Sequence, residues 1–133
     1  LYFAYGSNLN VKQMAIRCPE AVKMGSDFIS GWKLVFRTVA DIIPTKNINS
    51  KLPVGIWKIT DKCEIALDRY EGYPNLYGKL DINGMMTYKM NSNSYSLPSV
   101  SYFNTILEGY KDFNLDTSYL LDTLYAQREN IYE

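Results

Sequence analysis

The fold of this chain is organised around its first dozen residues, Leu1-Tyr2-Phe3-Ala4-Tyr5-Gly6-Ser7-Asn8-Leu9-Asn10-Val11-Lys12. The apolar run at the start predicts a buried strand over Tyr2–Tyr5, which ends at Gly6. A helix is expected to begin a few residues later. A strand, a glycine turn and a helix start can present backbone amides to an anion or an oxyanion. The same pattern is also typical of an ordinary strand-to-helix turn.

The helix that follows this turn carries several start signals. Asn10 is a suitable N-cap, and Gln13 lies three residues later, as in a capping box. Leu9 and Met14 have the spacing of a hydrophobic staple across the cap. Pro19 predicts the end of the helix. We therefore expect the loop before the helix to have fixed ends.

Composition bounds the class of protein. With 133 residues, 47% of them apolar, the chain is expected to form a single domain over residues 1–133 with one core. The formal net charge is zero, and no basic stripe predicts a nucleic-acid or membrane surface. The sequence shows neither a bilayer-spanning apolar run nor the form of a signal peptide, which predicts a cytoplasmic location.

Histidine is absent, and the two cysteines, Cys18 and Cys63, are far apart in the sequence. A Ser-His or Cys-His nucleophile is thereby excluded, and the sequence predicts no metal site. The cysteines are expected to be free thiols in or near the core. Any proton transfer would use a carboxylate, a lysine, a tyrosine or a cysteine.

Further strands are predicted from apolar runs that turn residues bound. They cover residues 21–28, 32–39, 53–59, 76–82 and 85–90. Asn83-Gly84 between the last two is the strongest hairpin signal in the chain. Residues 41–52 include Pro44 and a polar run, and are expected to form a loop whose role the sequence leaves open.

Three more helices are predicted from caps and apolar spacing. Asp61 is expected to cap the first, with Glu64 completing a capping box and Gly72 ending the helix. Ser99 and Asp116 are expected to begin the other two, whose apolar stripes should face the core. These stripes comprise Val100, Phe103, Leu107 and Tyr110, then Leu120, Leu124 and Ile131. The order of elements predicts an α+β domain with a mixed sheet that curls towards a barrel.

Glu71 is the carboxylate best placed for acid/base chemistry. At a helix C-terminus the dipole disfavours its ionised form, and burial among neighbouring tyrosines would do the same. Both effects raise the pKa of Glu71 towards the range of a general acid/base. A solvated Glu in a last helical turn is the alternative. Its tyrosine neighbours are Tyr70, Tyr73 and Tyr77.

Asp68 lies three residues before Glu71 and could share its face of the helix. A carboxylate pair is one interpretation. We favour a salt bridge between Asp68 and Arg69, which would leave Glu71 as the single functional carboxylate.

Three segments occur in a characteristic order. They are Tyr5-Gly6-Ser7-Asn8-Leu9, then Leu67-Asp68-Arg69-Tyr70-Glu71-Gly72-Tyr73-Pro74 with Tyr77, then Pro98-Ser99-Val100-Ser101-Tyr102 leading to Gly109. In this order and spacing the chain resembles the γ-glutamylcyclotransferase-like (AIG2-like) superfamily. The resemblance implies a small mixed β-barrel or curled sheet with flanking helices and a cleft. It also implies that no cofactor or metal is used.

The resemblance further implies an enzyme, a γ-glutamyl cyclotransferase that acts as an acyltransferase or lyase on a γ-glutamyl amide. The α-amine of the γ-glutamyl group attacks its own γ-carbonyl, releasing 5-oxoproline and an amine or amino acid. By this resemblance Glu71 moves the proton, and the loop residues bind the γ-glutamyl group with backbone amides. The implied substrate-binding residues are Tyr5, Gly6, Ser7, Asn8, Leu9, Tyr77 and Tyr102.

Two of the implied roles are open. Tyr102 is equally compatible with a place in the core. Lys79 stands where many family members carry Arg, and lysine does not reproduce a bidentate fork. The role of Lys79 therefore does not carry over.

Two other classes of function remain as alternatives. The same cleft could bind a small anionic or γ-glutamyl-like ligand without turnover. Alternatively, the tyrosines could form a surface for protein interaction. The sequence predicts a small-molecule partner, but it specifies neither the leaving amine nor the oligomeric state.

Overall fold

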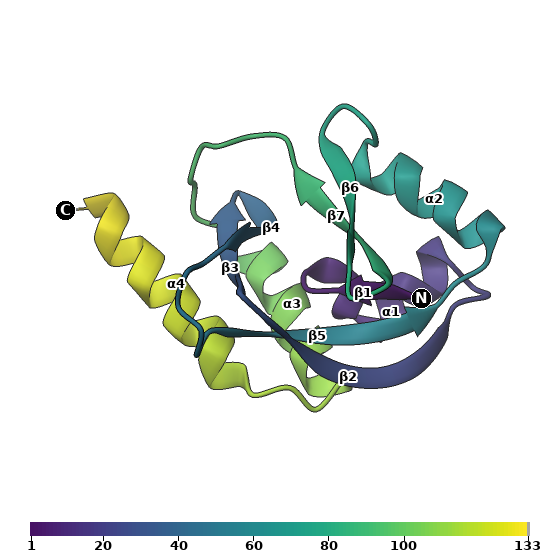
Figure 1. Ribbon diagram of the computed structural model, residues 1–133, viewed down its shortest axis with the longest axis horizontal. Coiled ribbons are helices and arrows are strands. Elements are labelled where there is room, and N and C mark those ends of the chain that lie inside the picture. Colours follow the sequence, from purple (N-terminus) through teal and green to yellow (C-terminus); the bar gives the residue numbers. More distant parts are fainter. Residues whose placement is uncertain (133) are drawn as a thin grey trace.

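The structure is a computed structural model that describes the backbone of residues 1–132 and the side chains of residues 1–130. Seven strands form a five-stranded sheet of order β2-β5-β1-β7-β6 and a separate two-stranded sheet, β3-β4 (Figure 1). The strands are β1 (Tyr2–Ala4), β2 (Val22–Ser30), β3 (Trp32–Arg37), β4 (Val39–Pro44), β5 (Lys51–Lys58), β6 (Tyr77–Ile82) and β7 (Met85–Met90). The larger sheet is mixed, because β1 pairs antiparallel with β5 and parallel with β7.

The helices flank these sheets. They are α1 (Val11–Arg17), α2 (Asp61–Glu71), α3 (Val100–Asp112), α4 (Thr117–Tyr132) and a 3-10 turn, η1 (Ser7–Leu9). Helix α1 packs on α2, α3 on η1, and α4 on β3 and α3. Figure 1 shows α2 and α4 at opposite ends of the molecule, with the long curved strands β2 and β5 between them. No helix within residues 1–132 has the length and hydropathy needed to cross a membrane.

The α+β fold class is confirmed, and the five-stranded sheet is curled rather than closed into a barrel. Its short central strand β1 is buried along its whole length, so the turn that follows it is anchored in the core. Phe3, Leu9, Phe36, Leu67 and Ile106 are among the fully buried side chains of this core.

Several local predictions are confirmed. Asn10 caps α1 as predicted, because its side chain accepts a hydrogen bond from the Gln13 amide. The reciprocal half of the predicted capping box is not formed, since the Gln13 side chain accepts from Arg17 and the Asn10 amide donates to the Ser7 carbonyl. Gly72 ends α2 in the left-handed conformation, with φ 64°. Residues Asn83 and Gly84 both have positive φ and join β6 to β7 in a tight hairpin.

Other local predictions are wrong. Residues 32–39 do not form one strand, because the chain reverses at Thr38 (φ 70°) and β4 pairs back on β3. The predicted loop 41–52 therefore shrinks to residues 45–50 between β4 and β5. Pro44, which favours a loop in the sequence, is in fact the last residue of β4, where its missing amide does not interrupt the sheet.

Helix ends also differ in detail. Thr60, not Asp61, caps α2 by accepting a hydrogen bond from the Cys63 amide. Val100 does not face the core, since 79% of it is exposed at the first position of α3. The side chain of Ile131 lies outside the described residues. Cys18 and Cys63 are free and buried, as predicted.

Candidate active site

A cavity of about 210 Å³ opens at the end of β1. Residues from the turn after β1, from α2, from β4 and from the strands β6 and β7 line it, together with Tyr102 of α3. Six of the lining residues are tyrosines, and Glu71 is the only charged one among the described residues. The predicted site residues Tyr5, Gly6, Ser7, Asn8, Glu71, Tyr77 and Tyr102 all reach this cavity.

Leu9 is the exception. Its side chain is fully buried beneath the loop and does not line the cavity. It fills the space between β5 and α3, so the resemblance assigned to substrate binding a residue that packs in the core.

The turn Gly6-Ser7-Asn8 leaves amides free. The amides of Leu9 and Asn10 donate to the carbonyls of Gly6 and Ser7. Within residues 1–132, the backbone amides of Gly6, Ser7 and Asn8 donate no hydrogen bond. These three residues line the cavity, so the turn has the unpaired donors that an oxyanion or carboxylate requires.

Gly6 is required by a close approach rather than by its dihedral angles. A Cβ atom there would lie 2.9 Å from Cβ of Ala40 and 3.4 Å from the hydroxyl of Tyr102. Any side chain would therefore push the turn away from β4 and from Tyr102.

Glu71 is the last residue of α2, and its carboxyl faces the turn. Its Oε1 accepts a hydrogen bond of 3.2 Å from Nδ2 of Asn8. Burial raises the pKa of Glu71 to about 7, although the Arg17 charge and the Asn8 hydrogen bond oppose this shift. The direction agrees with the sequence prediction. Of the three neighbouring tyrosines, Tyr70 and Tyr77 line the cavity with Glu71, whereas Tyr73 is 40% exposed and does not.

Tyr77 and Tyr102 share one backbone partner, Ala40 of β4. The Tyr77 hydroxyl donates to the Ala40 carbonyl at 2.7 Å. The Ala40 amide donates to the Tyr102 hydroxyl at 2.9 Å, which leaves the phenolic proton of Tyr102 available to another acceptor. Burial raises the pKa of both phenols, so both remain protonated donors at neutral pH.

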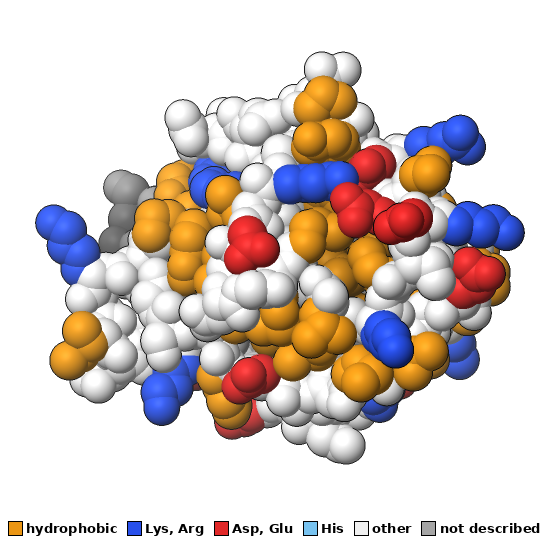
Figure 2. All heavy atoms as spheres, turned by 45° about the vertical axis from the view of Figure 1, so that its right-hand side comes forward, with side chains coloured by type: hydrophobic (Ala, Val, Ile, Leu, Met, Phe, Trp, Pro, Cys, Tyr) orange, Lys and Arg blue, Asp and Glu red, His pale blue; other side chains and the backbone are white. Residues whose placement is uncertain are grey.

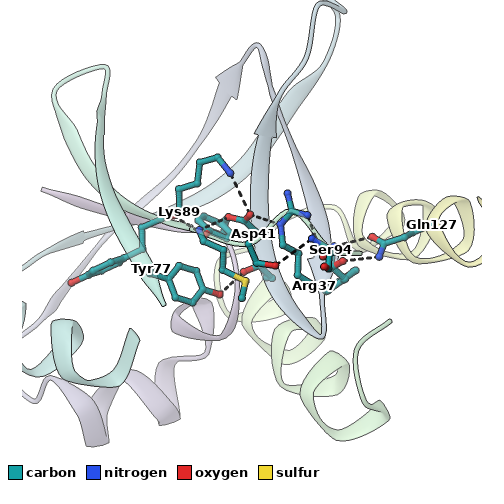
Figure 3. Close-up of polar contacts among 12 residues, drawn as sticks. Arg37, Asp41, Tyr77, Lys89, Ser94 and Gln127 are labelled. Carbon is teal, nitrogen blue, oxygen red and sulfur yellow. Dashed lines mark hydrogen bonds and ion pairs between the residues drawn. The ribbon is translucent and has the colours of Figure 1, made fainter. Parts of the chain in front are cut away.

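A buried ionic cluster holds β4 at the cavity wall (Figure 3). Oδ2 of Asp41 accepts from Nε of Arg37 at 2.7 Å and lies 3.4 Å from Nζ of Lys89. Its Oδ1 accepts from the Met90 amide of β7. Arg37 also donates to the Ser94 carbonyl. The sequence pattern places these residues in a loop and in separate strands, so it carries no signal for the cluster.

Asp68 is not paired with Arg69, contrary to the sequence interpretation. Its carboxylate forms an ion pair of 2.9 Å with Lys79 of β6 and accepts a hydrogen bond from the Tyr88 hydroxyl. Lys79 also pairs with Glu64 at 2.6 Å. Lys79 therefore joins β6 to two carboxylates of α2, outside the cavity. The sequence predicts the hairpin of β6 and β7, but it does not predict which hairpin residues contact α2.

Three residues near Glu71 were missed. The Tyr2 hydroxyl accepts from Nδ2 of Asn8, Tyr88 lines the cavity, and Arg17 donates to Oδ1 of Asn8. The sequence feature that could have pointed to Arg17 is its position in the last turn of the helix that directly follows the loop. Among the side chains of residues 1–130, no three His, Cys, Asp or Glu converge as a metal site.

The face turned forward in Figure 2 shows acidic and basic side chains interspersed, with hydrophobic side chains reaching the surface between them. The fold and the cavity together define a small α+β protein with one carboxylate, that of Glu71, in a tyrosine-lined cavity.

Residues 2–109 match the family model described as "Gamma-glutamyl cyclotransferase, AIG2-like", and the chain belongs to this family. No match was found among curated proteins. Among solved structures, an uncharacterized protein from Homo sapiens has 24% identity and a TM-score of 0.80, over 92% of this chain and 84% of that one. A structure named gamma-glutamyl cyclotransferase has 24% identity and a TM-score of 0.77, with the same coverage. YkqA from Bacillus subtilis has 16% identity and a TM-score of 0.76, over 96% of this chain and 53% of that one.

Proposed function

We propose that this protein is a γ-glutamyl cyclotransferase, which releases 5-oxoproline and an amine or amino acid from a γ-glutamyl amide. One observation carries the proposal: a carboxyl group with a pKa of about 7 and the unpaired amides of Gly6-Ser7-Asn8 line the same cavity. The first supplies a proton acceptor and donor at neutral pH, and the second supplies donors for developing negative charge. Membership of the family supports the same reaction.

The proton transfers begin at the substrate's α-ammonium, which cannot attack while it is protonated. The ionised Glu71 removes one proton, and the free amine forms a bond to its own γ-carbonyl carbon. As the tetrahedral intermediate collapses, Glu71 returns this proton to the leaving nitrogen and the original C–N bond breaks. The new ring nitrogen loses a second proton, which the released amine takes up at neutral pH. A single carboxyl near its pKa can serve both steps.

Neutral donors would hold the substrate. The amides of the turn would bind the α-carboxylate or the oxyanion, and the phenolic proton of Tyr102 would add a further donor. Ring closure within one bound molecule depends mainly on such positioning. The volume of about 210 Å³ suits a γ-glutamyl group with its leaving group directed to solvent.

The test is a panel of γ-glutamyl amino acids and amines assayed for 5-oxoproline with the wild-type protein and Glu71→Gln. Glutamine keeps the size of the side chain and its acceptor for Asn8 but cannot exchange the proton. We expect kcat/KM to fall by roughly 10²- to 10⁴-fold.

Glu129→Gln, on the exposed surface of α4, is the matched control and should retain full activity. Wild-type turnover by Glu71→Gln would contradict the acid/base role. Calorimetric binding of a γ-glutamyl compound with no release of 5-oxoproline would instead support the binding-protein alternative.

A further inference from the structure

Arg17 lies at the C-terminal end of α1, outside the cavity, and three contacts fix its guanidinium. Its Nη1 donates to Oδ1 of Asn8 at 2.7 Å. Nη2 donates to Oε1 of Gln13, one turn earlier in the helix. The guanidinium carbon also lies 3.6 Å from the ring centroid of Tyr70. An arginine held on three sides is a rigid part of the structure rather than a solvated side chain.

The Asn8 carboxamide transmits this contact to Glu71. Asn8 is only 3% exposed, and its two polar ends face different partners. Oδ1 accepts from Arg17, while Nδ2 donates to the Tyr2 hydroxyl and to Glu71. A guanidinium has only donors, so only the carbonyl end of the amide can face it. Arg17 thereby directs the NH2 group of Asn8 towards the carboxyl group.

A second route runs through Tyr70. The face of its ring lies against Arg17, and its hydroxyl is 3.2 Å from Oγ of Ser7 in the turn. The same guanidinium therefore restrains two residues of the turn that lines the cavity with Glu71, Asn8 directly and Ser7 through the ring of Tyr70.

We propose that Arg17 is a positioning residue, which orients the Asn8 carboxamide and through it the carboxyl group of Glu71. The consequence for turnover rests on the proposed function. Arg17 touches no reacting atom, since it does not line the cavity.

The electrostatic surroundings of Glu71 support this role. The titratable groups that interact with it from β1, the residue after β1, β6, β7 and α3 are protonated phenols at neutral pH: Tyr2, Tyr5, Tyr77, Tyr88 and Tyr102. Arg17 of α1 is the positive charge that opposes the rise in the pKa of Glu71. The nearby charges of Asp68 and Lys79 are paired with each other. Loss of Arg17 should therefore raise the pKa of Glu71 further.

The test compares wild type with Arg17→Gln, Arg17→Lys and Lys12→Gln. Lys12 is an exposed cation on the same helix, paired only with Glu108 among the described residues, so its loss matches the change in net charge. Two readouts are needed: the titration of the Glu71 carboxyl by NMR in protein with ¹³C-labelled glutamate, and the pH profile of kcat/KM for 5-oxoproline release.

We expect Arg17→Gln to raise the pKa of Glu71, to shift the acidic limb of kcat/KM to higher pH, and to lower kcat/KM at pH 7 on the order of 10- to 100-fold. Arg17→Lys keeps the charge but loses the planar contact with Asn8 and Tyr70. Compared with Arg17→Gln, Arg17→Lys should therefore bring the pKa of Glu71 closer to its wild-type value than it brings kcat. Lys12→Gln should change neither.

An unchanged Glu71 titration and an unchanged pH profile in Arg17→Gln would overturn the proposal, provided that thermal melting shows a folded variant. If Arg17→Gln does not fold, Arg17→Lys takes its place, and a wild-type kcat in that variant would also overturn the proposal. The titration decides even if the wild-type protein releases no 5-oxoproline. In that case the proposed function fails, whereas a raised pKa in Arg17→Gln still supports the positioning of Glu71.

Discussion

The raised pKa of Glu71 has a consequence for stability as well as for chemistry. The carboxyl titrates near 4.5 when unfolded and near 7 when folded. Below pH 4.5 both states are protonated, and the group has no effect. As the pH rises from about 4.5 to about 7, the unfolded state ionises first, so the free energy of unfolding of the native protein falls. Above pH 7 the folded protein bears the full cost of a buried carboxylate.

We therefore predict that Glu71→Gln stabilises the fold at pH 8 by about 3 kcal/mol, following the pKa difference. The gain should shrink as pH falls and disappear below about pH 4.5. Urea unfolding at pH 4, 6 and 8 measures it. A variant less stable than wild type at pH 8 would show that the carboxylate is not destabilising in the native state.

Single residues differed in how well the sequence predicted them. The direction of the pKa shift of Glu71 was predicted correctly because its signals are local: a helix end followed by Gly72, with aromatic residues beside it. Its proposed role in proton transfer came from the family resemblance. Arg17, Tyr2 and Tyr88 were missed because each acts through a side chain from another element, and their contacts depend on packing between elements. The predicted partner of Asp68 was wrong for the same reason, since folding brings Lys79 of another element to its carboxylate.

At the scale of elements, η1 is clamped between α3 and β5. A Cβ atom on Gly109 of α3 would lie 2.6 Å from Cβ of Leu9 and 2.8 Å from the Asn10 amide nitrogen. A Cβ atom on Gly55 of β5 would lie 2.7 Å from Cδ2 of Leu9. The turn that carries the free amides is therefore positioned by two elements that approach at glycines.

Gly109→Ala should displace the turn. Alanine favours a helix by up to about 1 kcal/mol, but the atoms it meets include backbone of the turn, which cannot rotate away. We expect a net loss of about 1–3 kcal/mol in stability, together with reduced 5-oxoproline release. Chemical denaturation and the activity assay measure both.

Gly78→Ala in β6 is the control, because its Cβ would meet its nearest neighbour, Oδ1 of Asn91, at 3.4 Å. It should leave stability and activity close to wild type. Full activity and stability in Gly109→Ala would mean that the turn does not depend on the approach of α3.

The sequence predicts well those elements whose ends are marked by capping or turn residues. The cap at Asn10, the left-handed Gly72 and the Asn83-Gly84 hairpin each follow from local conformational preference. Strand β4 was missed because its turn is centred on Thr38, whose positive φ is unusual for threonine. Nothing in the local sequence predicts that reversal, which is imposed by the pairing of β3 and β4.

At the scale of the whole molecule, the two sheets are joined by side chains rather than by a continuous ladder. Asp41 is fully buried and binds Arg37 within the small sheet and Lys89 and the Met90 amide of the large one (Figure 3). The Gln127 side chain of α4 accepts a hydrogen bond from the Phe36 amide and donates one to the Phe36 carbonyl. These two bonds attach α4 to β3 of the small sheet. Asp41 therefore attaches its neighbour Ala40, which forms part of the cavity wall, to β7 of the large sheet.

Asp41→Asn should weaken the whole fold. It leaves the buried Arg37 guanidinium without its counter-charge, which typically costs about 3–5 kcal/mol. Equilibrium unfolding in urea measures the loss, and a lower affinity for substrate should accompany it as the Ala40 wall moves.

Asp122→Asn, at an exposed position of α4, is the control and should change stability by no more than about 0.5 kcal/mol. A similarly small change in Asp41→Asn would mean that the cluster does not hold the sheets together.

The central place of β1 also governs when the cavity can form during folding. Its partners are β5 and β7, so the strand that precedes the amide turn pairs only with segments made much later in synthesis. Such distant pairings slow folding, because a long loop must close before any contact rewards it. The amides and Glu71 thus come together only once the sheet is assembled. A full-length chain that has not assembled this sheet has every residue of the site but lacks its geometry.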